Sequence, residues 1–330
     1  MNTRVLLAKR PEGEPKPDDF EIVQEPVPSP GDGELLVRAQ HLSLDPYMRG
    51  RMSAAKSYAK PVEVGEVMVG QTVGEVVESK NPKFSPGEVV LSQGGWQTYS
   101  IATGDGVIKL DPKNAPLTYA LGILGMPGQT AYCALLDIGK PKAGETVVVS
   151  AASGAVGSVA GQIAKIKGCR VVGVAGSAEK CRYVTEELGF DACIDRRTEN
   201  LNDALKKHCP DGIDIYFDNT AGTILEAVLR RINLHARIPL VGLIEQYNAT
   251  GDPVGPNLRP LLVNRALIEG FLFLDHLAHT KQFLADVGGW LREGKLRYRE
   301  DVVDGLENAP RALIGMLRGE NFGKLIVRVR

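Results

Sequence analysis

A β-branched run that stops abruptly in small residues is the feature that most constrains this chain of 330 residues. Residues 145–150 read Glu-Thr-Val-Val-Val-Ser, and residues 151–158 continue as Ala-Ala-Ser-Gly-Ala-Val-Gly-Ser, where a helical pattern begins at once. Ala152, Gly154 and Gly157 occupy the three small positions of the G-x-G-x-x-G pattern. Small residues let the backbone approach a pyrophosphate, and the N–H groups that open a helix point at it. We therefore predict a dinucleotide-binding turn, with an ordinary tight strand-to-helix turn as the alternative.

Strands and helices alternate after this turn. The apolar positions of the first expected helix fall on one face, at Val156, Val159, Ala160, Ile163 and Ile166. The expected strands are short and nearly all apolar, which is typical of a doubly wound parallel sheet. After the strand that begins at Thr146, we expect strands over 170–174, 192–194, 213–218, 237–241 and 268–274, and helices over 130–136, 156–167, 177–188, 201–208, 224–231 and 280–293.

Residues 1 to about 120 have a different character, with short strands broken by Gly and Pro. Such frequent turns favour a barrel-like β domain. The β-rich segments are 34–39, 68–77, 88–91 and, much later, 323–329. The fold class is therefore α/β, a doubly wound parallel sheet plus a β domain. We expect the β domain to comprise residues 1–124 and 295–330, and the nucleotide-binding domain to comprise residues 125–294.

The composition excludes several functional classes. A formal net charge of −1, with 39 basic and 40 acidic residues, provides no basic face for a nucleic acid or a membrane. No apolar run approaches the roughly 20 residues that cross a bilayer, and residues 1–10 do not form a secretory signal, so we expect a cytoplasmic protein. The five cysteines include no C-x-x-C, and only His276 and His279 lie close together among the histidines. We expect neither a disulfide framework nor a metal site.

The end of the second expected strand indicates which nicotinamide cofactor binds. An NAD site places Asp or Glu there, about 20 residues after the glycine turn, to hold the ribose 2′-hydroxyl. Here Gly176 and Ser177 stand at the tip, and Lys180 follows one turn into the helix. No carboxylate at the tip repels a 2′-phosphate, which favours NADP(H) over NAD(H). Two alternatives stay open: Lys180 is simply solvated, or Glu179 opposes the phosphate.

Several other segments are informative together. They are 44–52 (Leu-Asp-Pro-Tyr-Met-Arg-Gly-Arg-Met), 126–132 (Met-Pro-Gly-Gln-Thr-Ala-Tyr), 151–158, 217–219, 246–248, 269–271 and 319–324. In this order they resemble the zinc-free branch of the medium-chain dehydrogenase/reductase superfamily, and within it the prostaglandin reductase and alkenal double-bond reductase family. The resemblance covers essentially the whole chain. It implies a GroES-like β-barrel domain, built from both ends of the sequence, around a Rossmann domain.

The resemblance also bears on zinc and on assembly. Zinc-dependent members of the superfamily carry Gly-His-Glu near residue 65 and a cysteine-rich lobe. Residues 64–67 read Val-Gly-Glu-Val here, and no cysteine precedes Cys133. We therefore expect chemistry without zinc. The family further implies a homodimer in which residues 268–274 form a sheet edge that pairs across a twofold axis.

The family's reaction is the NADPH-dependent reduction of an α,β-unsaturated ketone or aldehyde. Hydride adds to the β-carbon, and the resulting enolate is protonated at the α-carbon. Without a metal, hydrogen-bond donors must meet the developing oxyanion. Tyr47 matches the family's Asp-Pro-Tyr segment and is expected to polarise the carbonyl group. Tyr247 matches its Tyr-Asn segment and is expected to contact the cofactor or relay a proton. A packed tyrosine with a satisfied hydroxyl is the alternative for each.

The resemblance further implies a set of contacts to NADP(H). Met126 and Thr130 are expected beside the nicotinamide, and Asn321 is expected to close over its end. The complete set is Met126, Thr130, Gly154, Ala155, Val156, Gly157, Ser158, Gly176, Ser177, Lys180, Arg196, Asn219, Gly242, Tyr247, Phe271, Leu272, Phe273 and Asn321. Simple core packing is the alternative for Phe271 and Phe273.

Two departures from the family pattern leave alternatives open. Arg196 stands where some relatives have tyrosine, and it either pairs with the adenosine phosphate or lies on the surface. Residues 261–265 lack a tyrosine that some relatives have there, so a mechanism that uses it is in doubt. A quinone reductase of the same superfamily and an NADPH-binding protein without turnover are the competing functions.

Overall fold

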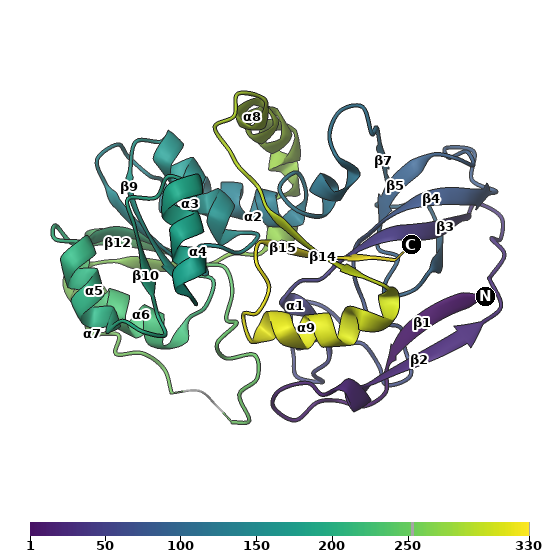
Figure 1. Cartoon of the computed structure of the whole chain (residues 1–330), viewed down its shortest axis with the longest axis horizontal. Coiled ribbons are helices and arrows are strands. Elements are labelled where there is room, and N and C mark those ends of the chain that lie inside the picture. Colours follow the sequence, from purple (N-terminus) through teal and green to yellow (C-terminus); the bar gives the residue numbers. More distant parts are fainter. Residues whose placement is uncertain (252–253, 330) are drawn as a thin grey trace. The chain divides into compact units, whose positions relative to one another are not determined.

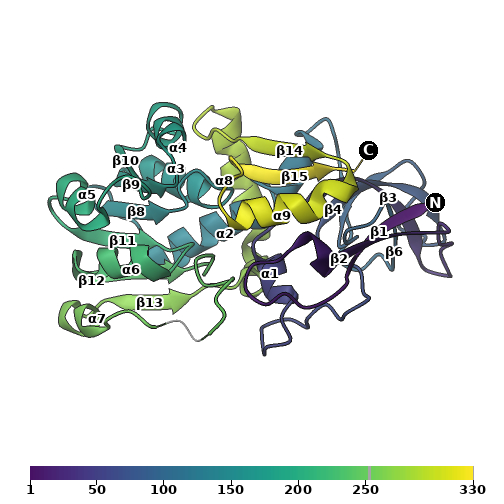
Figure 2. The same cartoon turned by 60° about the horizontal axis from the view of Figure 1, so that its bottom comes forward.

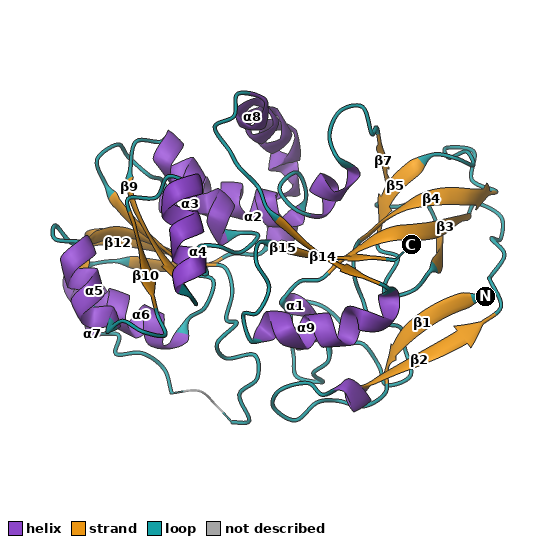
Figure 3. Ribbon diagram, viewed as in Figure 1, coloured by secondary structure: helices purple, strands orange, loops and turns teal. Residues whose placement is uncertain are grey.

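The structure is a computed structural model that describes residues 1–251 and 254–329. The chain divides into two compact units, one of residues 1–122 with 300–330 and one of residues 123–299. We call them the β unit and the parallel-sheet unit, after their main sheets (Figures 1 and 3). The expected α/β class, a Rossmann-type sheet plus a separate β unit, is confirmed.

In the described part of the parallel-sheet unit, six parallel strands lie in the order β10-β9-β8-β11-β12-β13. They are β8 (Thr146–Ser150), β9 (Arg170–Ala175), β10 (Ala192–Asp195), β11 (Ile213–Phe217), β12 (Ile232–Leu240) and β13 (Leu267–Gly270). Counted along the chain this order is 3-2-1-4-5-6, that of a Rossmann fold, and it reverses between β8 and β11. Val147 and Val148 are both fully buried although they point to opposite faces, so both faces are covered.

Helices connect these strands. They are α2 (Met126–Cys133), η3 (Ala134–Gly139), α3 (Gly157–Ile166), α4 (Ala178–Arg182), η4 (Tyr183–Glu187), α5 (Leu201–His208), α6 (Gly222–Leu229), α7 (Arg259–Asn264), η5 (Phe273–His279) and α8 (Thr280–Arg292). Helix α3 packs on β8 and β9, and α2 contacts both α3 and α8. Leu205 of α5 and Val228 of α6 join Val148 and Val172 in one buried cluster, which attaches these helices to the sheet.

One strand is shorter than expected. The strand predicted over residues 268–274 ends at Gly270. The Phe271 N–H donates to the Leu240 carbonyl at 2.9 Å, and the chain then turns into the 3₁₀ helix η5. The prediction was wrong beyond Gly270. The apolar run at 271–274 shows no hydrophobic periodicity, so its pattern does not distinguish a strand from a half-buried turn.

One helix is less regular than expected. The helix predicted over 177–188 is α-helical only as far as Arg182 and continues as the π turn η4. The Thr185 hydroxyl group lies 3.1 Å from the carbonyl oxygens of both Cys181 and Arg182. A side chain that bonds back into its own helix competes with the regular pattern, which favours such a local widening.

The β unit joins sequence from both parts of the chain. Among its described residues, a seven-stranded sheet has the order β14-β15-β3-β4-β5-β7, with β6 also paired to β3, and β1 and β2 form a separate pair. The strands are β1 (Asn2–Leu7), β2 (Phe20–Glu25), β3 (Leu35–Ser43), β4 (Thr72–Ser79), β5 (Val89–Ser92), β6 (Tyr99–Ala102), β7 (Ile108–Leu110), β14 (Glu300–Asp304) and β15 (Lys324–Arg328). The helices are η1 (Pro17–Asp19), α1 (Tyr47–Arg51), η2 (Leu117–Leu121), η6 (Leu306–Asn308) and α9 (Ala309–Leu317).

Strand β15 is the element that closes this unit. It pairs antiparallel with β3, Val327 opposite Leu42, and parallel with β14. Helix α9 packs alongside β15 (Figure 2). Val327, Leu42, Met48 and Trp96 are fully buried in one core cluster, so the late strand and the early strands share a core.

Two further structural findings bear on the sequence analysis. Among the described residues, no helix combines the length and the apolar character needed to cross a bilayer. The five cysteines are all free thiols. The division into domains of residues 1–124 with 295–330 and 125–294 stays a prediction.

Candidate active site

The turn between β8 and α3 is too tight for larger residues. A Cβ atom on Gly157 would lie 2.4 Å from the Ala151 carbonyl oxygen, and one on Gly154 would lie 3.2 Å from it. Ala151 itself has a positive φ of 48°. Helix α3 begins at Gly157. The Gly154 and Ser158 N–H groups donate within the turn, to the Ala151 and Gly154 carbonyls at 2.9 and 3.0 Å. The positive end of the helix dipole at this turn suits a pyrophosphate. The predicted contacts Gly154 to Ser158 form this turn and the start of α3.

The point where the strand order reverses is built by Ser150, the last residue of β8, and Asn219, which follows β11. The Asn219 N–H donates to the Ser150 hydroxyl oxygen at 2.8 Å, and its side-chain amide donates to the Ser150 carbonyl at 2.7 Å. A Cβ on Gly242 would lie 2.9 Å from the Asn219 carbonyl oxygen. Asn219 and Gly242 therefore lie together at the carboxyl ends of the strands, where ligands bind in such sheets.

Asp218, which was not predicted as a site residue from the sequence, organises the same edge. Its carboxylate accepts hydrogen bonds from the N–H groups of Thr220 and Ala221 at 2.9 and 2.8 Å, and from the Tyr216 hydroxyl at 2.9 Å. Its second oxygen is buried and makes no hydrogen bond. Burial raises the pKa of Asp218, although these hydrogen bonds oppose the rise. Ala221 has a φ of 56°, a conformation that L-residues rarely adopt and that the Asp218 bond holds in place.

Cationic side chains gather at the end of β9. A Cβ built on Gly176 would lie 3.8 Å from Nε of Arg197 and 4.0 Å from Nε of Arg196, and both arginines are exposed. The Ser177 hydroxyl oxygen accepts the Lys180 N–H at 3.3 Å, which caps the start of α4. The structure thus brings the predicted contacts Gly176 and Arg196 together. Arg197 was not among the residues predicted from the sequence.

Two carboxylates lie near this tip. Glu179 is exposed on α4. Asp195 ends β10 and pairs in register with Ala175, but its carboxylate is buried and accepts the Arg197 N–H at 3.0 Å. Asp195 differs from the ribose-binding acid of an NAD site in its place, since it ends β10 rather than β9, and in its burial.

The start of α2 carries two predicted nicotinamide contacts. Met126 is the first residue of the helix and is half-buried, and Thr130 is buried one turn later. Gly128 between them has no room for a side chain, since a Cβ would lie 1.9 Å from the Ile123 carbonyl oxygen. That close approach fixes the position of the first turn of α2.

The remaining predicted contacts of this unit follow the last two strands. Tyr247 is half-buried in the turn after β12. The residues from Phe271 to Phe273 are half-buried and follow β13, so they do not pack in the core as strand residues. The Phe271 ring stacks on the His276 imidazole, with 4.5 Å between the ring centroids and 26° between the planes.

Tyr47 belongs to the β unit, where it begins α1 directly after a buried ion pair. The Lys324 ammonium lies 2.8 Å from the Asp45 carboxylate and donates to the Leu44 carbonyl at 2.7 Å. The second Asp45 oxygen accepts the Ser43 hydroxyl. Burial lowers the pKa of Lys324, while Asp45 raises it. Two segments that carried the resemblance, 44–52 and 319–324, thus meet at one buried pair.

The Tyr47 hydroxyl is a candidate hydrogen-bond donor. Burial, and then the nearby Asp45 carboxylate, raise the pKa of Tyr47 well above its usual value. The phenol therefore stays protonated at neutral pH and able to donate. Asn321 lies in the same unit, and its side-chain amide donates to the Gly323 carbonyl at 2.9 Å. All other predicted site residues belong to the parallel-sheet unit.

Two family descriptions match the chain. Residues 3–110 match the family described as the N-terminal domain of oxidoreductase. Residues 155–287 match the family described as zinc-binding dehydrogenase. The two matches fall on different parts of the chain, the first within the β unit and the second within the parallel-sheet unit.

Whole proteins are similar over nearly their full lengths. The NADPH-dependent curcumin reductase of Escherichia coli (strain K12) is 51% identical over 334 residues, which cover 99% of this chain and 97% of that protein. Prostaglandin reductase 1 of Rattus norvegicus is 44% identical over 328 residues, which cover 98% and 97%. The crystal structure of CurA in complex with NADPH from Vibrio vulnificus has 50% sequence identity and a TM-score of 0.96, with 99% of each chain covered.

Proposed function

The chain belongs to the prostaglandin reductase and alkenal reductase family of the medium-chain dehydrogenase/reductase superfamily, and from that premise we propose that it reduces the C=C bond of α,β-unsaturated ketones and aldehydes with NADPH. The observation that carries the proposal is the similarity over nearly the whole chain to NADPH-dependent reductases. The tip of β9 supports the choice of NADPH, because two arginines lie close to Gly176 and no acidic residue stands at positions 175–177.

The residues of the parallel-sheet unit hold the cofactor. The turn from Gly154 to Ser158 receives the pyrophosphate, and Arg196 with Lys180 and Ser177 receives the 2′-phosphate. Met126, Thr130 and Phe271 contact the nicotinamide end. NADPH, when bound, supplies the hydride that adds to the substrate β-carbon.

Tyr47 is the proposed electrophilic donor. As hydride arrives at the β-carbon, negative charge develops on the substrate carbonyl oxygen. A neutral phenol meets that oxygen with a hydrogen bond that strengthens in the transition state. Tyr247 is proposed to contact the cofactor or to relay the proton that the α-carbon takes up. Both roles rest on the match of these tyrosines to the family's segments and, for Tyr47, on its protonated state.

The experiment follows NADPH oxidation with a simple conjugated enone and identifies the product. We expect the saturated ketone, with loss of the C=C absorbance and with the carbonyl retained. An allylic alcohol as the main product would refute the proposal. Faster turnover across a panel of quinones than across a panel of enones would assign the chain to quinone reduction, and NADPH binding without turnover on either panel would refute an enzymatic role.

We propose that this reduction needs no zinc. No cysteine precedes Cys133, so the β unit offers no thiolate to a catalytic zinc ion. A hydrogen-bond donor replaces the Lewis acid at the carbonyl oxygen. The test is to strip metal from the enzyme with a chelator and measure kcat well below the temperature at which the metal-free protein unfolds. We expect kcat to stay within about twofold. A kcat that vanishes and returns with zinc would contradict this.

We propose that the protein is a cytoplasmic homodimer joined through β13. Strand β13 lies at the edge of its sheet, and all four of its residues are exposed. Apolar side chains cluster there and on the preceding α7, where Leu262 is 80% exposed. An apolar edge with unpaired backbone groups needs cover.

The proposed cytoplasmic location rests on the free thiols, which are typical of a reducing compartment. Subcellular fractionation would check this location.

A further inference from the structure

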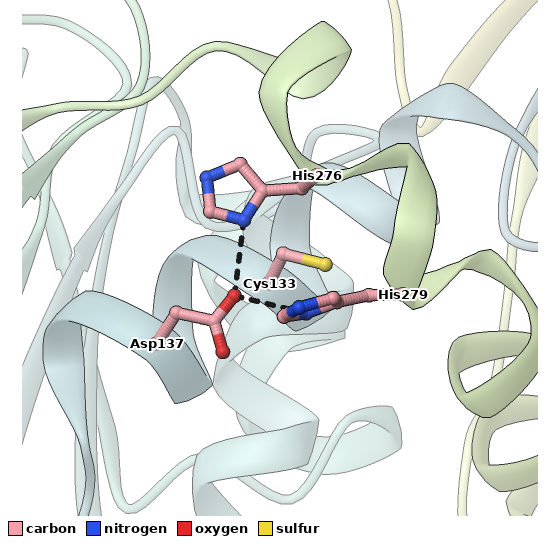
Figure 4. Close-up of side chains that lie close together, drawn as sticks. All are labelled: Cys133, Asp137, His276 and His279. Carbon is pink, nitrogen blue, oxygen red and sulfur yellow. Dashed lines mark hydrogen bonds and ion pairs between the residues drawn. The ribbon is translucent and has the colours of Figure 1, made fainter.

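Four side chains with metal-binding atoms meet on one side of the parallel-sheet unit: Cys133, Asp137, His276 and His279 (Figure 4). One ligand atom from each lies within 4.8 Å of the others. Nδ1 of His276 lies 3.0 Å from Oδ2 of Asp137, and Nδ1 of His279 lies 3.2 Å from the same oxygen. Four donors thus surround one small volume.

The backbone explains how the four converge. Cys133 ends α2 and Asp137 lies in η3, which continues it, so the two stand four residues apart on one face. His276 and His279 stand three residues apart in η5, which is kinked at His276, and their rings meet edge to face with 5.8 Å between the centroids. Each pair presents its two side chains to the other pair (Figure 4).

Other contacts already hold these two segments against each other. The Gln129 amide of α2 donates to the His276 carbonyl at 2.9 Å, and the Thr280 hydroxyl donates to the Gln129 side-chain oxygen at 3.1 Å. The His276 ring is further fixed by its stack on Phe271. The donors are therefore positioned before any ion arrives, which lowers the cost of binding.

The donor chemistry selects the ion. A thiolate, two imidazoles and a carboxylate are the ligands of tetrahedral zinc, whereas Mg²⁺ and Ca²⁺ prefer oxygen donors alone. A thiolate and a carboxylate also balance the charge of a divalent cation, so that the filled centre is neutral. Without an ion, both imidazoles share one carboxylate oxygen, which uses only part of this donor set.

We propose that Cys133, Asp137, His276 and His279 bind one zinc ion and thereby fasten η5 to the end of α2. The four protein donors fill a tetrahedral shell and leave no open position for a substrate, so the ion is structural. This site is separate from the reduction proposed above, which needs no zinc. It also departs from the expectation, drawn from the sequence, that the chain has no metal site.

The experiment loads chelator-treated full-length protein with Zn²⁺ or with Co²⁺ as a spectroscopic probe. We expect one zinc per chain by elemental analysis and a rise in the unfolding midpoint of about 5 °C when zinc is a hundredfold above its Kd. Cobalt should give tetrahedral d–d bands and a thiolate-to-cobalt charge-transfer band. A protein that takes up no stoichiometric zinc would overturn the proposal.

Variants locate the site. Cys133→Ser should abolish the charge-transfer band, and His279→Gln should weaken zinc binding by at least about tenfold. His279 is exposed, so its replacement leaves the fold intact even if Cys133→Ser does not. His235→Asn is the matched control, because His235 is exposed, lies outside the cluster and has a φ of 61° that asparagine tolerates. Equal zinc affinity in His279→Gln and the wild type would overturn the proposal.

Discussion

At the scale of single residues, a buried ion pair determines where Tyr47 stands. Lys324 is 1% exposed and Asp45 is 5% exposed, and an uncompensated charge at either position would be costly. The pair anchors the residues that lead into α1, with the Ser43 hydroxyl and the Leu44 carbonyl as further partners. The position of the proposed donor is therefore fixed by a residue almost 280 positions away.

Replacement of Tyr47 tests its role as donor. Tyr47→Phe removes the hydroxyl group and little else, so kcat for an enone should fall by about 10²-fold while NADPH binds as before. Steady-state kinetics and a separate NADPH titration measure the two effects. Tyr99→Phe, in strand β6 of the same unit, is the control and should leave kcat unchanged. A Tyr47→Phe enzyme with wild-type kcat would exclude the role.

The cations at the tip of β9 should discriminate between the two nicotinamide cofactors. Arg196→Ala or Lys180→Ala removes a charge proposed to meet the 2′-phosphate, so we expect Kd for NADPH to rise about tenfold and Kd for NADH to stay constant. Fluorescence titration measures both constants. Lys206→Ala, on the exposed surface of α5, serves as the control. An equal loss for NADPH and NADH would show that the 2′-phosphate lies elsewhere.

At the scale of elements, Arg237 of β12 ties three segments together. Its guanidinium lies 3.0 and 2.6 Å from the two carboxylate oxygens of Glu145, just before β8, and donates to the Gly139 carbonyl at the end of η3. Both side chains of the ion pair are 18% exposed. Burial alone would raise the pKa of Glu145, but the bonds from Arg237 and the Lys142 N–H outweigh it and hold the pKa below 4.5.

This pair should make stability depend on pH. Since the folded-state pKa of Glu145 is depressed, its contribution is present above about pH 4.5 and is lost as the pH falls through the folded value. Arg237→Met should cost about 2 kcal/mol at neutral pH, and less in acid. Denaturant unfolding at several pH values measures this cost. Arg38→Met is the control, because its partner Glu75 is more exposed and the pair contributes less than about 1 kcal/mol. A cost that does not change with pH would contradict the prediction.

The bounds of an element could be predicted where residues close in the sequence determine them. They could not be predicted where tertiary contacts or a single side-chain hydrogen bond determine them. The helix over 201–208 was predicted with its observed bounds, because Asn200 caps it and its apolar residues recur at helical spacing. The end of β13 and the π turn after Arg182 depend on tertiary bonds and on one threonine side chain.

The residues of the candidate site fall into the same two groups, those that could be predicted from the sequence and those that could not. The small residues of the glycine turn could be predicted because their steric requirement is local. Three features were missed: Arg197, Asp218 and the pairing of Asp45 with Lys324. Each depends on contacts between strands that lie apart in the sequence. The same holds for the cluster of Cys133, Asp137, His276 and His279, since Cys133 and His276 lie 143 positions apart in the sequence.

At the scale of the whole molecule, the sequence of the parallel-sheet unit interrupts the sequence of the β unit. The parallel-sheet unit is continuous in sequence, whereas the β unit needs segments from either side of it. The sheet edge at β13 belongs to the continuous unit, so the proposed dimer does not depend on the segments that complete the β unit.

A charge on the exposed edge should separate the proposed dimer. Ile268→Lys places an ammonium group on β13, so we expect a monomer by size-exclusion chromatography with light scattering, where the wild type runs as a dimer. Ile22→Lys, at an exposed position of β2 in the β unit, is the control and should stay dimeric. A monomeric wild type would refute the dimer outright.

The pairing of β15 with β3 also dictates the order in which the protein matures during translation. The parallel-sheet unit is complete in sequence before β15 is made, but the His41–Ser43 end of β3 has no strand partner on its β15 side, and Asp45 has no lysine partner, until Lys324–Arg328 emerges. Nascent chains therefore pass through a stage in which this end of the β-sheet is open. A premature stop codon before Lys324 would leave every product in that state, even though nearly all of the coding sequence had been read.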